Sequence, residues 1–302
     1  MTRVCDYEDS RYRYDFWEGK GREYEDLVER TALRALMPAG GDTLMDIGAG
    51  YGRLAPLYAG YRRVVLLDYA RTQIEEARRY LVEPGRYTLV VADVYNLPFV
   101  DHLFDVVTMV RVMHHLADVP RALVELQRVV RPQGVAVLEY ANKRHWKSVA
   151  RWLLRRQSWN PFDRQPVEFA DLNFDFHPAW MSQQMREAHF GVEAVRSVSH
   201  FRMPLLKRLL PGQWLAALDA VVQPTGQWAQ FTPSIFVRAR AEKPAAIEPA
   251  GFFCCPACRN SDLHTGATSL DCPRCGRRWS VADGIYDFRT PVVEPEHRAN
   301  MQ

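Results

Sequence analysis

Short apolar runs alternate with helical patterns along the chain from Thr43 onward. Each run is apolar almost throughout, which is typical of a strand buried on both faces. Strands that alternate with helices indicate βαβ units and a parallel sheet covered on both sides. We therefore expect strands at 44–47, 64–67, 89–92, 106–110 and 135–138, and helices between them that include 72–81 and 122–130.

The pattern is less regular on both sides of this alternation. Before it, an aromatic, charged stretch leads into a helical pattern at 24–37, which Pro38 and the Gly40-Gly41 pair end. After it, the pattern predicts a helix at 178–189, a strand at 192–201, an inserted helical element at 204–222 and a last strand at 234–239.

These changes divide the 302 residues, a length that is comfortable for two domains. We predict a helical lid at 1–42 and a central α/β domain at 43–240, with inserted segments near 143–175 and 200–232. A linker rich in proline, alanine and glutamate at 241–251 then precedes a cysteine-containing module at 252–290. In the lid, Tyr14, Phe16 or Trp17 can lie against a ligand, or the lid can simply pack on the core.

A glycine-rich loop follows the first strand of the alternation. The strand ends at Asp46 and the loop reads Gly48-Ala49-Gly50-Tyr-Gly52. Glycines allow a tight turn and a close approach of the backbone to a ligand, because no Cβ intervenes. A dinucleotide fingerprint needs its last glycine one position later, where this chain has arginine. The loop therefore favours a nucleoside ligand without pyrophosphate.

Acidic residues end the next two strands. Asp68, followed by Tyr69, ends the second strand, and an acid there can accept both ribose hydroxyls. Asp93 ends the third strand, where a carboxylate can face an adenine amino group while Val94 lies against the ring. A single strand-end aspartate is usually a helix cap, so it is the combination with the glycine loop that indicates a cofactor site.

Residues 43–142 resemble the class I S-adenosylmethionine (SAM)-dependent methyltransferases, in particular the small-molecule group that includes quinone-biosynthesis enzymes. The resemblance lies in LMDIGAGYG, VLLDYA, ADVYNLPF, FDVVTMVRVMHHLAD and RVVRPQGVAVLEY. The PQG at 132–134 departs from the family's usual PGG. The resemblance implies a Rossmann-like fold with SAM as cofactor. It also implies that Gly48, Gly50, Asp68, Asp93 and the segment around Arg111 contact SAM.

Two histidines follow the fourth strand, at the expected mouth of the site. Methyl transfer is an in-line displacement that depends mainly on alignment and exclusion of water. His114 or His115 can act as general base if the acceptor keeps its proton, or either can pack near SAM without a chemical role. The resemblance favours the packing role for His115. The [ND]PP[YF] motif of enzymes that methylate amino groups of bases or glutamine is absent.

Four cysteines form two CPxC pairs with thirteen residues between them. Four thiolates at this spacing can close a tetrahedral structural zinc site, and there is no room for two thioredoxin-like redox units. We predict that Cys255, Cys258, Cys272 and Cys275 hold zinc, with Cys5 and Cys254 free. Loss of zinc should unfold only this module and leave SAM binding largely intact.

Residues 252–289 resemble the small zinc-ribbon proteins that activate methyltransferases. That resemblance implies a zinc ribbon fused in cis, which stabilises the catalytic domain or helps to present substrate.

Composition excludes little. The net charge of +3 does not by itself indicate nucleic acid. The charged N-terminal stretch is unlike a signal peptide, and no run approaches 18 uncharged apolar residues, so we expect a cytoplasmic protein without a membrane span. Four basic residues recur every four positions and would line one helical face: Lys143, Lys147, Arg151 and Arg155. Such a face can meet RNA or anionic lipid, or simply be solvated.

We expect methyl transfer from SAM to an unidentified small-molecule or lipid-like acceptor. Its pocket should come from 1–37, 143–175 and 200–232, which hold most of the tryptophans and suit an apolar or planar molecule. Two alternatives remain. One is an RNA methyltransferase that uses the ribbon and the basic face at 143–156. The other is a SAM-binding scaffold without turnover.

Overall fold

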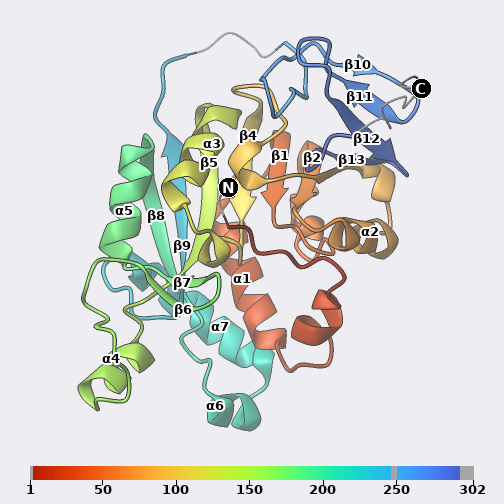
Figure 1. Ribbon diagram of the computed structural model, residues 1–302. Coiled ribbons are helices and arrows are strands. Elements are labelled where there is room, and N and C mark those ends of the chain that lie inside the picture. The colour runs from red at the N-terminus through yellow and green to blue at the C-terminus, as the bar shows by residue number, and fades with distance from the viewer. Residues whose placement is uncertain (1–2, 246–249, 293–302) are drawn as a thin grey trace, which may run out of the picture.

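The computed structural model describes residues 3–245 and 250–292. These residues form an α/β sandwich around one long mixed sheet (Figure 1). The strand order is β10-β11-β12-β13-β3-β2-β1-β4-β5-β9-β8. The central strands run parallel to one another and are β3 (Tyr87–Val91), β2 (Tyr61–Asp68), β1 (Gly41–Ile47), β4 (Phe104–Met109) and β5 (Val130–Ala141).

All five predicted parallel strands are confirmed, with bounds that differ by a few residues. β1 sits in the middle of the sheet, and its Leu44, Met45 and Ile47 are buried. The last two strands run antiparallel to each other, with β9 (Ser234–Ala241) between β5 and β8 (Phe190–Val198). Both were predicted as strands. The Rossmann-like methyltransferase topology expected from the sequence is therefore present.

Helices cover both faces of the sheet, as the alternating pattern predicts. One face carries α1 (Glu23–Leu36), α2 (Arg71–Tyr80) and α7 (Gly212–Val222), and the other carries α3 (Val119–Val129) and α5 (Pro178–Glu187). The start of α3 illustrates why a helix begins there: the Asp118 carboxylate accepts a hydrogen bond from the Arg121 backbone N–H at 3.1 Å. Short helical turns lie at Arg13–Trp17, Ala55–Tyr58, Pro84–Arg86, Val94–Asn96, Met113–His115 and Gln223–Gln227.

The inserted segments hold α4 (Trp146–Leu153), the hairpin of β6 (Val167–Ala170) and β7 (Asn173–Asp175), and α6 (Pro204–Leu209). The helical element predicted at 204–222 is split into α6 and α7, because Pro211 precedes α7 as its N-cap. The predicted four-residue basic stripe is wrong at both ends: Arg155 lies beyond the end of α4 at Leu153 and has a φ of +55°. Lys143 lies before α4, is buried, and donates to the carbonyl oxygens of Asp163 and Gln165.

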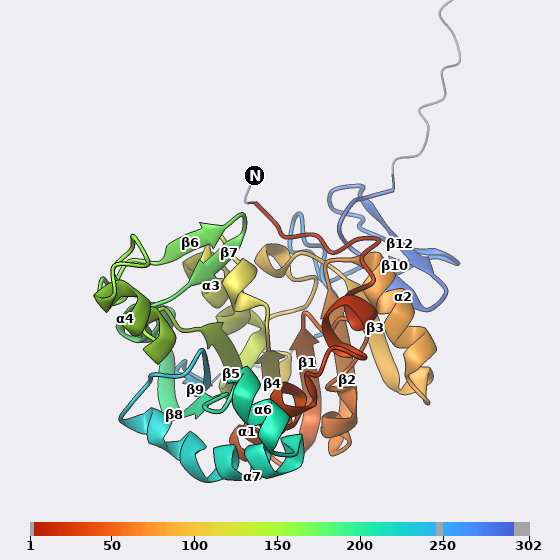
Figure 2. The ribbon, with the colours of Figure 1, turned by 90° about the horizontal axis from the view of Figure 1, so that it is seen from below.

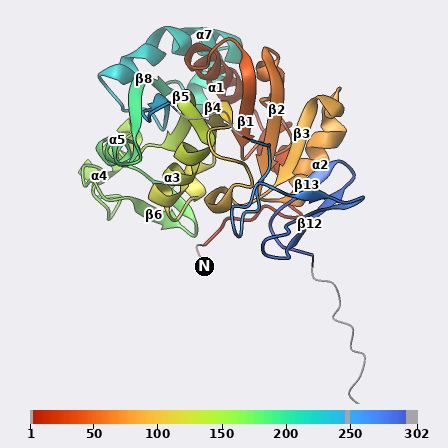
Figure 3. The same cartoon turned by 90° about the horizontal axis from the view of Figure 1, so that it is seen from above.

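The cysteine-containing module continues the sheet. Its strands are β10 (His264–Thr265), β11 (Ser269–Asp271), β12 (Arg278–Ala282) and β13 (Ile285–Asp287), and β13 pairs in parallel with β3 (Figure 3). Ile285 and Phe288 are buried in the hydrophobic core around the central strands. The predicted linker at 241–251 lies partly outside the described residues. The module therefore covers the edge of β3 and shares the core around the central strands.

The buried carboxylate of Glu29 joins α1 to the ends of two central strands. Its Oε1 accepts a hydrogen bond from Arg111 Nε and its Oε2 accepts one from Arg53 Nη2, each at 2.7 Å. Arg111 follows β4, and Arg53 follows the glycine-rich loop after β1. Burial raises the pKa of Glu29, but the two guanidinium groups outweigh burial and hold it below its usual value. The carboxylate is thus ionised at neutral pH.

Replacing Glu29 by glutamine should destabilise the protein strongly. The substitution removes the ion pair of the largely buried Arg111 and leaves Arg53 with Asp26 as its counter-charge, and breaking a buried ion pair typically costs about 3–5 kcal/mol. Urea unfolding followed by circular dichroism measures this free energy. Asp42→Asn is a matched control, because Asp42 forms its ion pair with Arg62 at the exposed surface and should matter much less. Equal losses in the two variants would contradict the role of Glu29.

Candidate active site

A cavity of about 290 Å³ opens at the carboxyl edge of the parallel strands. This is the edge where open α/β sheets bind ligands. Figure 2 shows the N-terminal segment above the end of β1, running from the β6–β7 hairpin to α2. The cavity is therefore walled by strand ends on one side and by a strap from the N-terminus on the other.

The glycine-rich loop forms the floor of the cavity beside β1. Gly48 has a φ of +71°, and a Cβ on it would lie 2.0 Å from Cγ2 of Val112. Gly50 has a φ of +53°, and its backbone N–H donates to Asp68 Oδ2 at 2.9 Å. Only glycine fits the first position, because a side chain there would enter the loop after β4.

Asp68 ends β2, and each of its carboxylate oxygens accepts one hydrogen bond from the backbone. Oδ2 accepts from Gly50, and Oδ1 accepts from the backbone N–H of Ala70 at 3.0 Å. A carboxylate has about four acceptor positions, so lone pairs remain for two ribose hydroxyls. Burial raises the pKa of Asp68 to about 6, although the backbone N–H groups of Ala70, Gly50 and Tyr69 oppose that effect.

Asp93 combines a structural role with a place in the cavity wall. It caps the short turn that follows β3, accepting from the Tyr95 backbone N–H at 2.9 Å and from Asn96 Nδ2 at 3.3 Å. Asp93 and Val94 also line the cavity, next to Tyr69. The helix-cap role and the proposed adenine contact are thus compatible in one residue.

Three of the predicted cofactor residues do not line the cavity: Asp46, Ala49 and Gly52. Asp46 is buried below the loop, where Thr108 Oγ1 donates to its carboxylate at 2.8 Å. Burial raises the pKa of Asp46 to about 6. Gly52 has a φ of +78° and forms the next turn of the chain. The geometry gives these residues a part in shaping the loop.

Arg111 lines the cavity, but its guanidinium is bound to Glu29. Its φ is +60°, and its backbone N–H donates to Glu139 Oε2 at 2.8 Å. The ring of Trp17 lies 5.0 Å from the guanidinium carbon. Arg111 therefore positions the loop after β4, and Trp17 is buried beside it instead of facing the cavity.

The two histidines have different partners, although both line the cavity. His115 Nδ1 lies 2.8 Å from the Leu172 carbonyl oxygen, and its Nε2 lies 3.1 Å from the Tyr7 hydroxyl. A carbonyl only accepts, so Nδ1 carries the proton and Nε2 accepts from Tyr7. The Nδ1 atom of His114 is buried without a hydrogen-bond partner. Burial lowers the pKa of His114 well below its usual value, and His115 and Arg111 lower it further.

The N-terminal strap lies in the segment 1–37, which was predicted to contribute to the pocket, and supplies cavity residues that sequence reasoning did not single out: Arg3, Val4, Cys5, Tyr7, Tyr12 and Arg22. Phe16 also lines the cavity, in agreement with the alternative that lid residues lie against a ligand, whereas Tyr14 is exposed. The inserted segments add Asn173 and Arg202. The aromatic content of the first residues was the only available signal, since nothing in their spacing says that they reach the sheet edge.

Tryptophans were expected to contribute to the acceptor pocket, but none of them lines this cavity. Trp146, Trp214 and Trp228 are exposed. The aromatic lining consists of tyrosine and phenylalanine, with the two histidines. A planar ligand can still stack there, but on the strap and not on the inserted helices.

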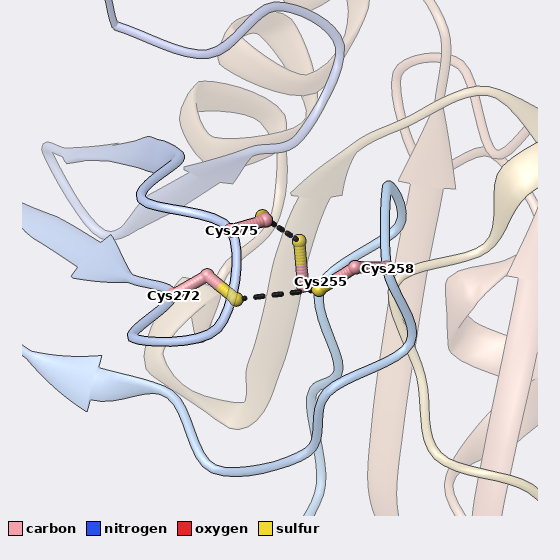
Figure 4. Close-up of side chains that lie close together, drawn as sticks. All are labelled: Cys255, Cys258, Cys272 and Cys275. Atoms are coloured by element: carbon pink, nitrogen blue, oxygen red, sulfur yellow. Dashed lines mark hydrogen bonds between the residues drawn. The ribbon is translucent and has the colours of Figure 1, made fainter.

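The four predicted metal ligands converge at one point in the module (Figure 4). The Sγ atoms of Cys255 and Cys275 lie 3.6 Å apart, those of Cys258 and Cys272 lie 3.4 Å apart, and all four fall within 4.8 Å of one another. Thiolates about 2.3 Å from a tetrahedral zinc ion lie about 3.8 Å from each other, so this set fits such an ion. Cys254 points elsewhere, and its thiol donates to the Phe99 carbonyl oxygen.

Comparison with known proteins assigns the class. Residues 45–138 match the family model described as a methyltransferase domain. A demethylmenaquinone methyltransferase of Clavibacter sepedonicus is 28% identical over 222 residues, which cover 70% of this chain and 85% of that protein. A 2-methyl-6-phytyl-1,4-hydroquinone methyltransferase of a Synechocystis species is 26% identical over 80% of this chain and 73% of its own length.

The fold also matches a chain in the complex of the Haloferax volcanii Trm112 methyltransferase activator with a methyltransferase. The TM-score is 0.52 at 21% identity, over 78% of this chain and 99% of that one. This likeness shows the Rossmann-like methyltransferase fold. With a methyltransferase domain at residues 45–138 and relatives that are methyltransferases, the chain is a SAM-dependent methyltransferase.

Asp68→Ala should weaken the binding of SAM and of S-adenosylhomocysteine alike, because both contain the ribose. A lost hydrogen bond to a charged group is worth about 1.5–3 kcal/mol. In the native protein the affinity should fall as the pH falls through about 6, because a protonated Asp68 loses acceptor capacity. Asp68→Asn should bind weakly without that pH dependence. Calorimetry at several pH values measures both effects, and undiminished binding by the alanine variant would refute this placement.

Proposed function

We propose that this enzyme transfers the methyl group of SAM to a small aromatic acceptor related to quinones, in its reduced hydroquinone form. The observation that best supports this proposal is that the glycine loop, Asp68, the aromatic strap and His114 all line one cavity. Relatives named as quinone and hydroquinone methyltransferases support the acceptor class.

The cavity has a chemically suitable place for each part of SAM. Adenine lies beside Asp93 and Val94, and ribose lies at Asp68, as argued above. The methionine end then points along Gly48 and Gly50 toward Tyr12 and the loop after β4, since these line the same cavity. The methyl group is thereby directed into the space under the strap.

Arg22 is suited to the carboxylate of the methionine. Its guanidinium lies over the rings of Phe16 and Trp17, and the structure shows it no carboxylate partner among residues 3–245 and 250–292. Burial lowers the pKa of Arg22, and the positive charges of Arg111 and Arg202 lower it further. A bound anion would relieve that repulsion, so we assign Arg22 to the cofactor carboxylate.

His114 is the residue best placed to take a proton from the acceptor. It is neutral at physiological pH, because its pKa is held low, and its Nδ1 is without a partner in the structure. The proton of the acceptor hydroxyl passes to the imidazole, the resulting oxygen anion or the ring carbon beside it attacks the methyl group, and the bond from that methyl to sulfur breaks to leave S-adenosylhomocysteine. If carbon is the nucleophile, that ring carbon then releases its proton to water, which restores the aromatic ring. His115, with both ring nitrogens occupied, holds the strap through Tyr7.

A turnover assay tests the activity and the roles of the histidines together. The enzyme is mixed with SAM and a reduced prenylated naphthohydroquinone, and S-adenosylhomocysteine and the methylated product are quantified by mass spectrometry. His114→Gln should lower kcat about a hundredfold or more with SAM affinity unchanged. His115→Gln should instead raise the KM for SAM, because it frees the strap. Tight SAM binding without turnover on any hydroquinone would favour the scaffold alternative and refute our proposal.

We further propose that the four thiolates hold a structural zinc ion and that the ribbon supports the cofactor site. Arg289, just after β13, donates to Glu8 Oε2 at 2.7 Å. The Glu8 carboxylate also accepts from the backbone N–H groups of Arg71 and Thr72, at the start of α2. The Arg289 guanidinium carbon lies 5.5 Å from the centre of the Tyr69 ring. The ribbon thus reaches the strap and the residue next to Asp68.

Cys272→Ser should lose about one equivalent of zinc, whereas Cys254→Ser should retain it. The sequence alone predicts that SAM binding then largely persists. The Arg289 contacts lead us to expect weaker SAM binding in Cys272→Ser, and about two- to fivefold weaker binding in Arg289→Gln with zinc retained. Elemental analysis and calorimetry measure these effects. Zinc retained in Cys272→Ser, or lost in Cys254→Ser, would overturn the ligand assignment.

A further inference from the structure

Two groups of exposed apolar side chains lie on the inserted segments. The first, here the α4 patch, consists of Trp146, Leu153, Leu154, Phe162 and Phe169. The second, the α6 patch, consists of Met203, Leu205 and Leu209. Leu153 and Leu209 are 67% and 68% exposed. Side chains of this size are normally covered in a folded protein, so eight of them in two short segments call for an explanation.

The shape of α4 directs these side chains away from the protein. Ser148 is buried and fixes the inward face of the helix, while Trp146 and Leu153, seven residues or about two turns apart and therefore on one face, are exposed. Lys147 and Arg151 are also exposed. The outward side of α4 therefore presents an apolar strip with a cationic border.

Positive charge is concentrated at the two patches. Segment 143–166 has seven basic residues and one acidic residue, and segment 200–211 has three basic residues and none that is acidic. The whole chain carries a net charge of only +3, so this is a local concentration. Within the part of the chain that the structure describes, six exposed basic side chains here have no ion-pair partner: Lys147, Arg151, Arg155, Arg156, Arg164 and Arg208.

Both patches adjoin segments that wall the active-site cavity. Arg202, which lines the cavity, stands two residues before α6, and Asn173, which also lines it, belongs to the hairpin that carries Phe169. In Figure 1, α4 and α6 both lie at the lower edge of the molecule, and in Figure 2 α4 lies at the left and α6 beside α1, below the N-terminal segment. A surface in contact with both patches would thus lie beside the cavity.

We propose that the α4 and α6 patches dock on an anionic lipid bilayer, with the apolar side chains in the headgroup boundary and the basic side chains against the phosphates. Apolar anchors bordered by lysine and arginine are what interfacial binding requires. Among the described residues no helix is long and apolar enough to cross a membrane, which leaves surface docking. Phosphates of RNA would also attract the basic side chains, but RNA makes no use of exposed leucines. The docking rests on the proposed function only in its purpose, which is to let an acceptor dissolved in the bilayer enter the cavity.

The test uses the full-length zinc-loaded enzyme and vesicles without any acceptor. Co-sedimentation is measured with phosphatidylcholine vesicles and with an equal mixture of phosphatidylcholine and phosphatidylglycerol. The anchor variant is Leu153→Gln with Leu209→Gln, and the charge variant is Arg151→Gln with Arg155→Gln. The matched control is Val82→Gln with Arg34→Gln, since both residues are exposed and lie outside the patches. SAM affinity is measured for each variant and should equal that of the native enzyme.

Native enzyme should bind the mixed vesicles much more than phosphatidylcholine alone, and less as salt increases. The anchor variant should lower the partition coefficient about tenfold or more, since it removes two apolar side chains from the bilayer. The charge variant should lose the preference for anionic lipid, and the control should behave as native. No binding to mixed vesicles, equal losses in the control, or charge-dependent RNA binding in place of vesicle binding would overturn the proposal. Turnover on dispersed acceptor is independent of these outcomes, so failure of docking and failure of the proposed activity are distinguishable.

Discussion

The buried ion pairs of Glu29 hold the architecture of the active site in place. This one carboxylate binds Arg53 after the glycine-rich loop and Arg111 after β4, so it connects α1 to two neighbouring strand ends. The strap that leads into α1 is thereby anchored at the carboxyl edge of the sheet. Glu29 is buried, so its removal would cost the ion pair of Arg111 and one of the two ion pairs of Arg53, which also binds Asp26. The position of the cavity follows from this constraint.

The two ends of the cavity are built in different ways. The end that we propose for the cofactor consists of residues at the ends of consecutive strands, which the hydrogen-bonded sheet places side by side. The end that we propose for the acceptor consists of the strap, with single residues from the hairpin and from the segment before α6. The strap is held by His115 and by Glu8, which are themselves bound to the hairpin and to α2. Such an arrangement can close over SAM and exclude water during methyl transfer.

The cysteine-containing module, here called the ribbon, completes one edge of the central sheet. Without β13, strand β3 would end the sheet with unpaired backbone groups, and exposed edges of this kind favour aggregation. The ribbon pairs with that edge, places Phe288 in the core, and carries Arg289 to the strap. The cysteine cluster is then connected to the strap through a strand and an ion pair.

The sequence by itself determined the elements and the chemistry that depend on local order. Apolar runs predicted the five parallel strands. The spacing of the glycines and of the strand-end acids predicted that Gly48, Gly50, Asp68 and Asp93 lie together, and the two CPxC pairs predicted the cysteine cluster. Contacts between distant segments were decided only by the tertiary structure. Lys143 is buried and lies outside the predicted basic stripe, Arg111 binds Glu29, and β13 pairs with β3. The sequence did not predict these contacts, because the partner of a buried charge or of an edge strand lies far away along the chain.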